Sequence, residues 1–154
     1  MSDTGQLDDF VPYQLSITSN MVSQLIAGEY HTRFGLKVPE WRVMAVLGDV
    51  SQATQRDIAW RSYMDKVAVN RACKGLEERA LIARVPNQAD GRSHLLALTE
   101  AGWALHGEIM PLALRMEKRL LERFCDEERA TLTALLERLR RAVEAEQGNG
   151  KGRG

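Results

Sequence analysis

Side chains that can bind nucleic acid recur at helical spacing in the middle of the sequence, at Lys66, Asn70, Arg71 and Lys74. Intervals of four, one and three residues place them on one face of an α-helix. In the major groove of DNA, asparagine suits bidentate contact with adenine and arginine with guanine, whereas lysine more often reaches phosphate. We therefore expect this face to contact double-stranded DNA, with Asn70 and Arg71 reading bases and the two lysines positioning the helix.

The other face of the same segment is apolar, with residues at i, i+3, i+4 and i+7 spacing. It comprises Val69, Ala72, Cys73, Leu76 and Ala80. A charged amphipathic helix is more often only a solvated surface helix, so the neighbouring segments must decide between the two interpretations.

Those neighbouring segments predict a winged helix-turn-helix. Residues 54–60 have helical character, and a tight turn over residues 61–64 joins them to the charged helix. Downstream, residues 81–85 and 94–98 predict two strands that bracket a hairpin. A helix, a turn, a second helix and a basic hairpin form the fold that inserts one helix into the major groove. We interpret the chain as a DNA-binding transcription regulator.

The start of the helix over residues 54–60 offers further contacts to DNA. Thr54 can cap this helix, and Asp57 three residues later completes a variant of the capping box. Gln55 and Arg56 would lie at the exposed N-terminus, where free backbone N–H groups and the helix dipole favour a phosphate. Solvated polar residues would give the same pattern.

Charge is informative only when it is counted by region. Lys+Arg and Asp+Glu each number 21 in 154 residues, so the net charge is zero. Residues 54–98 hold eight Lys or Arg against five Asp or Glu, whereas residues 1–53 hold three against six and residues 99–154 hold ten of each. The predicted DNA-binding segment is therefore the basic one. No run of eighteen apolar residues exists, and residues 1–5 are acidic and polar, so the sequence supports neither a membrane span nor a signal peptide. We expect a soluble, cytoplasmic protein.

The sequence indicates no cofactor, metal or enzymatic site. Cys73 and Cys125 have no pairing motif and are expected to be reduced thiols, with Cys73 buried on the apolar face of its helix. The three histidines are scattered, and no Cys/His cluster has metal-ligand spacing. Because no nucleophile–base pair or phosphate-binding glycine loop is present, an enzyme is the weakest interpretation.

The N-terminal third of the chain predicts two helices. Residues 7–34 form the first, with Pro12 in its first turn and Gly35 ending it. Pro39 opens the second, whose buried side comprises Trp41, Val43, Met44, Val46 and Leu47.

The C-terminal third predicts another pair of helices. Thr99 caps a helix that runs to about Phe124 with a kink at Pro111, and the last helix continues to residue 146. The glycine-rich residues 147–154 are expected to be disordered.

These elements divide the chain into a winged helix-turn-helix domain over residues 36–98 and a helical dimerisation region formed by residues 7–34 and 99–146. The predicted fold class is mainly α with a small two-stranded wing (α+β). A long helix with an apolar stripe buries that stripe only by packing on other elements, which favours a dimer. The alternative is an intramolecular bundle in a monomer.

The sequence resembles the MarR family, the multiple-antibiotic-resistance type of bacterial regulator, from about residue 10 to residue 145. The most specific part is Asp90-Gly91-Arg92-Ser93 followed by residues 95–102, which is similar to the family's Asp-x-Arg wing signature and Leu-Thr-x-x-Gly helix start. Residues 38–47 are similar to its second helix and residues 65–82 to its recognition helix and exit.

Several positions depart from the family pattern. Val67 and Ala68 stand where small hydroxyl residues are usual, so DNA contacts there would be apolar, for instance to a thymine methyl. Gly75 inside the recognition helix costs roughly 1 kcal/mol relative to alanine. Ala80 replaces the glycine that the family usually has at the helix exit.

The resemblance implies a homodimer that binds a pseudo-palindromic operator, usually as a repressor. Arg92, at the tip of the tight Asp90-Gly91 turn, is expected to enter the minor groove, with Asp90 bracing it and Ser93 as a neighbouring contact. An ordinary solvated hairpin charge is the alternative for Arg92.

Some members of this family release DNA when a small aromatic acid binds, and we expect an inducer of that kind or its thioester here. Trp41 and Arg42 offer an aromatic wall and a cation for such a ligand, and the resemblance adds Asn20, Tyr63 and Arg71. Trp41 could instead be a simple core residue. The alternative function for the chain is a dimerisation or adaptor module without specific DNA binding.

Overall fold

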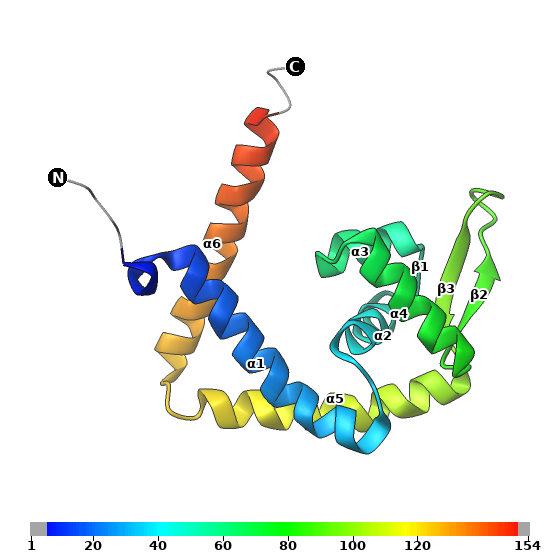
Figure 1. Cartoon of the computed structure of the whole chain (residues 1–154), viewed down its shortest axis with the longest axis horizontal. Coiled ribbons are helices and arrows are strands. Elements are labelled where there is room, and N and C mark those ends of the chain that lie inside the picture. The colour runs from blue at the N-terminus through cyan, green and yellow to red at the C-terminus, as the bar shows by residue number, and fades with distance from the viewer. Residues whose placement is uncertain (1–5, 151–154) are drawn as a thin grey trace. The chain divides into compact units, whose positions relative to one another are not determined.

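The computed structural model describes residues 6–150, which form six α-helices, one short 3-10 helix and three strands (Figure 1). In chain order these are η1 (Leu7–Asp9), α1 (Val11–Phe34), α2 (Val38–Val50), β1 (Gln52–Ala53), α3 (Gln55–Ser62), α4 (Lys66–Glu78), β2 (Ile82–Pro86), β3 (His94–Leu98), α5 (Glu100–Leu121) and α6 (Asp126–Gly150). The chain divides into two compact units, one up to Ala113 and one from Leu114 onward. The predicted fold class, a mainly helical α+β winged helix-turn-helix, is confirmed.

The first unit has one continuous hydrophobic core, and α2 and α4 supply much of it. Their fully buried side chains come at helical spacing, at Val43, Met44 and Leu47 on α2 and at Cys73 and Leu76 on α4. Burial raises the pKa of the Cys73 thiol to about 11, and the Glu77 carboxylate contributes to the rise. The predicted apolar face of α4 is thus buried.

Ala80 is an exception to that prediction. It lies beyond the end of α4, is exposed, and has a left-handed backbone with φ 54°. The helix ends before its apolar periodicity does, because the chain must turn sharply to enter β2. At this φ an alanine is strained where a glycine would not be.

The sheet has the strand order β1-β3-β2, with both pairs antiparallel. β2 and β3 form the predicted hairpin, which extends away from the helices in Figure 1. The structure adds β1, a strand that the sequence prediction missed: Gln52 and Ala53 pair with Ala97 and Leu96. This third strand ties the wing to the segment between α2 and α3.

Side-chain caps fix where the helices of the helix-turn-helix begin. Thr54 Oγ1 accepts a hydrogen bond from the Asp57 backbone N–H, and the Asp57 carboxylate accepts one from the Thr54 N–H, both at 3.1 Å. This capping box confirms the prediction for α3. Asp65 Oδ1 caps α4 by accepting a hydrogen bond of 2.8 Å from the Ala68 N–H.

The start of α5 shows why the sequence has threonine and glycine three residues apart. Thr99 Oγ1 accepts a hydrogen bond from the Gly102 N–H at 3.1 Å and donates one to the Ala80 carbonyl at 2.7 Å. A Cβ on Gly102 would lie 2.0 Å from the carbonyl oxygen of Leu81. Only glycine allows α5 to pack this closely against the exit of α4.

Several predicted boundaries need correction. α3 runs to Ser62, so the turn predicted over residues 61–64 begins only at Tyr63. Residues 7–9 form a 3-10 turn, and α1 begins only at Val11, after the extended Phe10. α5 ends at Leu121 rather than near Phe124. α6 extends to Gly150, so residues 147–150 are helical and not disordered, because the preceding helix propagates through them; the rest of the predicted tail, residues 151–154, lies outside the described residues.

The second unit consists of the end of α5 and the whole of α6. The Cys125 backbone N–H donates to the Glu128 carboxylate at 3.0 Å, and this hydrogen bond holds the pKa of that exposed carboxyl below its usual value. Arg129 Nε donates to the carbonyl of Leu121 at 3.0 Å, which closes the turn between the helices. Among the described residues, no helix combines the length and the apolarity that crossing a membrane requires.

Candidate nucleic-acid interface

The face of α4 opposite the core forms one wall of a groove whose other wall is the N-terminal end of α3. The groove has a volume of about 620 Å³. It is lined by Gln55, Arg56, Lys66, Val67, Val69, Asn70, Arg71 and Lys74. The structure thus brings together seven residues that the sequence predicts to contact DNA, and four of the seven are arginines or lysines.

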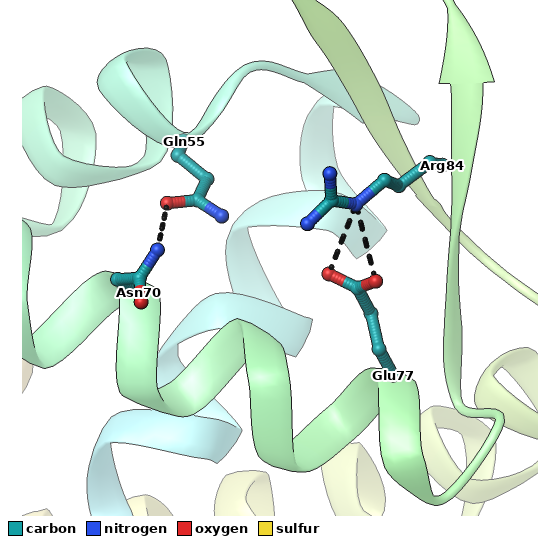
Figure 2. A network of polar contacts seen from close by, with 4 residues as sticks. All are labelled: Gln55, Asn70, Glu77 and Arg84. Atoms are coloured by element: carbon teal, nitrogen blue, oxygen red, sulfur yellow. Dashed lines mark hydrogen bonds and ion pairs between the residues drawn. The ribbon is translucent and has the colours of Figure 1, made fainter.

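Two polar contacts hold α4 in place on this side (Figure 2). Asn70 Nδ2 donates a hydrogen bond of 3.3 Å to Gln55 Oε1, which links α4 to α3. Glu77 accepts from Arg84 Nε on β2, with an ion-pair distance of 3.2 Å. Because the Arg84 side chain is 55% exposed, this ion pair adds little stability, but it links α4 to the wing.

Gly75, whose presence in a helix is unfavourable in itself, is explained by packing against α2. A Cβ at this position would lie 2.7 Å from Glu40 Oε2. Glu40 is buried, and its Oε1 accepts a hydrogen bond of 2.9 Å from the Lys37 backbone N–H at the start of α2. The missing side chain lets α4 approach α2 closely.

Ala68 was also predicted to contact DNA. It lines a smaller groove between α2 and α4 rather than the groove between α3 and α4.

The wing is held by hydrogen bonds between its own residues. Asp90 Oδ1 accepts from the backbone N–H of Arg92 at 3.0 Å, so Asp90 braces the backbone of the tip and leaves the exposed arginine side chain pointing outward. Asn87 Nδ2 donates to Ser93 Oγ at 2.9 Å across the hairpin. Ser93 therefore has a role within the wing in addition to the DNA contact predicted for it.

A second groove, of about 480 Å³, lies between the start of α3 and the wing. Four residues predicted to contact DNA line this groove, namely Gln55, Arg56, Asp90 and Ser93. Arg84 and His94, which were not predicted to contact DNA, line it as well. Alternation along β2 could not have identified Arg84, because it would place Arg84 on the same face as the buried Ile82, whereas Ala83 and Arg84 are both exposed.

Comparison with known proteins agrees with this geometry. A model of the MarR family matches residues 34–93. An uncharacterised HTH-type transcriptional regulator of Bacillus subtilis (strain 168), YwoH, is 30% identical over 125 residues, which are 80% of this chain and 88% of that protein. The crystal structure of a MarR/EmrR family transcriptional regulator from Acinetobacter sp. ADP1 has a TM-score of 0.84 and 31% identity, and the match covers 91% of this chain and 99% of that one. The chain belongs to the MarR family.

Members of the MarR family are transcriptional regulators, and this chain is therefore a regulator rather than an enzyme. A crystal structure of mutant MarR from E. coli complexed with operator DNA has a TM-score of 0.72 at 22% identity, covering 82% of this chain and 91% of that one. At 22% identity, the similarity between the two chains shows a shared fold.

The candidate ligand residues of this MarR-family chain do not all lie together. Trp41 is a core residue, in contact with the rings of Tyr30 and His106 at centroid distances of 6.0 and 5.5 Å. Arg42 is exposed and donates a hydrogen bond of 3.2 Å to Ser23 Oγ on α1. Arg71 lines the α3–α4 groove, whose lining does not include Trp41 or Arg42.

The other two ligand candidates are both on the surface. Asn20 is exposed on α1, and Tyr63 is exposed at the left-handed end of α3, with φ 57°. What the sequence did not predict is the row of rings around Trp41. His106, whose pKa is lowered by burial, connects Trp41 to the partly exposed Trp103 at a centroid distance of 5.7 Å.

Proposed function

We propose that this MarR-family protein is a cytoplasmic, homodimeric, sequence-specific DNA-binding repressor that recognises a pseudo-palindromic operator. The observation that supports this most directly is the division of α4 into a buried apolar face and an exposed basic face that lines a groove. A helix anchored on one side and cationic on the other suits the major groove of a duplex.

In this proposal each exposed residue of the groove has a role that follows from its chemistry. Asn70 and Arg71 read base edges, while Lys66 and Lys74 neutralise phosphates. The remaining contacts divide between phosphates at the start of α3 (Gln55, Arg56), apolar contacts at the start of α4 (Val67, Ala68) and the wing (Asp90, Arg92, Ser93). Operator DNA in the crystal structure of the E. coli MarR mutant supports the same class of partner here.

Exposed apolar residues on the long helices support the homodimer. On α1 these include Leu15, Met21 and Leu25, and on α6 they are Leu132, Leu135, Leu136, Leu139 and Val143. A row of leucines in water is unfavourable, and burial stabilises each by about 1.5–3 kcal/mol. A second copy of the chain would cover these faces. This agrees with the prediction that residues 7–34 and 99–146 form a dimerisation region.

We include in the proposal a small aromatic acid, or its thioester, that releases the operator. Arg42 supplies a cation beside the Trp41 position, and the row of rings from Tyr30 to Trp103 supplies aromatic surface. Such a ligand relieves repression only if it binds the DNA-incompetent arrangement more tightly. A thermal-shift screen of aromatic acids and thioesters, repeated with operator present, tests this: a ligand must stabilise the free protein and displace DNA.

Replacing Arg71 with alanine tests the DNA-binding proposal. Sequences bound by the wild-type protein are first selected from random duplexes, and binding to single-base variants is then measured at fixed salt. The Arg71→Ala protein should lose about 1–3 kcal/mol of discrimination at one position of each half-site. The control is Arg33→Ala, an exposed arginine on α1, which should leave the discrimination among bases unchanged.

The adaptor alternative predicts a different result. A dimer that binds no duplex at low salt, or that binds all duplexes equally, would contradict sequence-specific repression and favour the adaptor module.

A further inference from the structure

Gln55 and Asn70 face each other across the groove, although they are fifteen residues apart in the chain. Gln55 is the first residue of α3 and is half-buried, and Asn70 lies on the exposed face of α4. Their side-chain amides meet end to end, with Asn70 Nδ2 donating to Gln55 Oε1 at 3.3 Å (Figure 2). Both side chains line the groove that we propose holds DNA.

The two backbones that carry this contact are firmly anchored. Next to Gln55, the Thr54–Asp57 capping box fixes the first turn of α3, and Ile58 is fully buried below it. Next to Asn70, Val69 is buried in the core. The fold therefore sets the separation between the two backbones from which these amide groups extend.

With Gln55 as the acceptor, this contact directs the Nδ2 side of the Asn70 amide toward α3. An asparagine amide has two N–H donors on one side and a carbonyl acceptor on the other, and a half-turn about its last bond exchanges them. Bidentate recognition of adenine needs one Nδ2–H directed at N7 and Oδ1 accepting from N6. When Gln55 accepts one of the two Nδ2 hydrogens, the other hydrogen and Oδ1 remain for a base edge.

We propose that Gln55 is a specificity-determining positioning residue, which holds the Asn70 amide in the orientation that selects adenine. This role replaces the phosphate contact that the sequence predicts, and that the proposed function assigns, for Gln55, and it rests on the proposed DNA-binding function. A phosphate contact strengthens binding to every sequence alike, whereas a positioning residue changes the preference among bases at one position of the half-site.

Two substitutions at this position separate the roles. In Gln55→Met the side chain keeps a similar length but cannot accept the hydrogen bond. In Gln55→Glu the carboxylate accepts it as the amide oxygen does, but adds a negative charge near the phosphates. Duplexes selected by the wild-type protein provide the probe, and Asn70→Ala identifies the base pair that Asn70 reads.

We expect Gln55→Met to lose most of the adenine preference at that base pair, roughly a 5- to 150-fold ratio in the wild-type protein, while preferences elsewhere persist. Gln55→Glu should keep that preference and bind every sequence more weakly. If Gln55→Met keeps the wild-type preference and weakens all sequences equally, Gln55 is a phosphate contact and the inference is wrong. Equal loss of preference in Gln55→Met and Gln55→Glu would also overturn it.

A measurement without DNA separates this inference from the proposed function. The side-chain NH₂ resonances of Asn70, observed in ¹⁵N–¹H spectra of the free protein, should shift in Gln55→Met and stay close to wild type in Gln55→Glu. Unchanged resonances in Gln55→Met would show that the contact is absent, whether or not the protein binds DNA. If the resonances shift as expected but no duplex is bound, the proposed function alone fails.

Discussion

α4 and α6 are both amphipathic helices, but only α4 has its apolar face covered within its own compact unit. The side chains of Val69 and Leu76 on α4 are 1% and 0% exposed, whereas those of Leu135 and Leu139 on α6 are 51% and 39% exposed. None of the residues of α6 whose side chains the structure describes is buried. The winged helix-turn-helix therefore has its core within one polypeptide, and the apolar face of α6 requires another surface.

This difference assigns separate tasks to the two regions. A region with its own core can hold a side chain such as Asn70 in a fixed position, because the neighbouring Val69 is buried in that core. A region with uncovered leucines can bring two such surfaces together. Substitutions should therefore affect assembly or the DNA-binding surface independently, and the expected effects below run from largest to smallest.

Leu139→Glu on α6 should abolish the dimer. A two-fold interface contains the residue twice, so losing about 1.5–3 kcal/mol of burial per leucine raises the dissociation constant by about 10²- to 10⁴-fold. Sedimentation at micromolar concentration measures this directly. The control, Ala134→Glu, places the same charge on the opposite side of α6 and should remain dimeric. If the two variants sediment alike, the apolar face of α6 is not part of the dimer interface.

Gly102→Ala should destabilise the winged helix-turn-helix by about 1–3 kcal/mol, because the added Cβ would overlap the Leu81 carbonyl oxygen, only 2.0 Å away, and force the backbone to shift. Gly107→Ala on the same helix has nothing within 4 Å of the added Cβ, and should stabilise by up to about 1 kcal/mol through helix propensity. Free energies of unfolding from urea titration measure both. If both variants change the free energy of unfolding in the same direction, α5 does not pack as closely on the exit of α4 as described.

Arg92→Ala should weaken operator binding and lower the salt dependence of the association constant by about one ion, while the dimer and the fold stay unchanged. The reason is that the side chain at the wing tip is exposed and, in the proposed function, contacts DNA. Fluorescence anisotropy at several salt concentrations measures the slope. Gln88→Ala, also exposed in the hairpin, is the control, and an unchanged slope in Arg92→Ala would exclude the wing from binding.

Ala80→Gly should have the smallest effect, a stabilisation of about 1 kcal/mol, because φ 54° is strained for alanine and relaxed for glycine. Ala83→Gly, at an exposed position on β2, should instead destabilise the protein. The melting temperatures of the two variants, compared with that of the wild-type protein, measure both changes in stability. A loss of stability in Ala80→Gly would show that its left-handed backbone is not a source of strain.

The sequence predicts those features that depend on neighbouring residues. The Thr54–Asp57 capping box, the buried face of α4 and the start of α5 at Thr99 each follow from a pattern within about four residues. The predicted face of α4 is also where the structure exposes Asn70 and Arg71.

The features that were missed depend on distant residues. β1 has two residues, too few to show any alternation, and exists because Leu96 and Ala97 offer a partner edge. Gly75 looks unfavourable until Glu40 is placed against it, and the contact between Gln55 and Asn70 requires the crossing of two helices. The prediction that residues 147–150 are disordered rested on composition alone and was wrong, because these residues continue α6.

Selection of bound sequences from a pool of random duplexes, using the full chain, tests the central claim most directly. Two copies of α4 related by a two-fold axis, about 34–36 Å apart, should enrich an inverted repeat whose half-site centres lie about 10–10.5 base pairs apart. An adenine within each half-site should lose its enrichment in Asn70→Ala. Enrichment of a single unrepeated site, or of no sequence at all, would contradict the account.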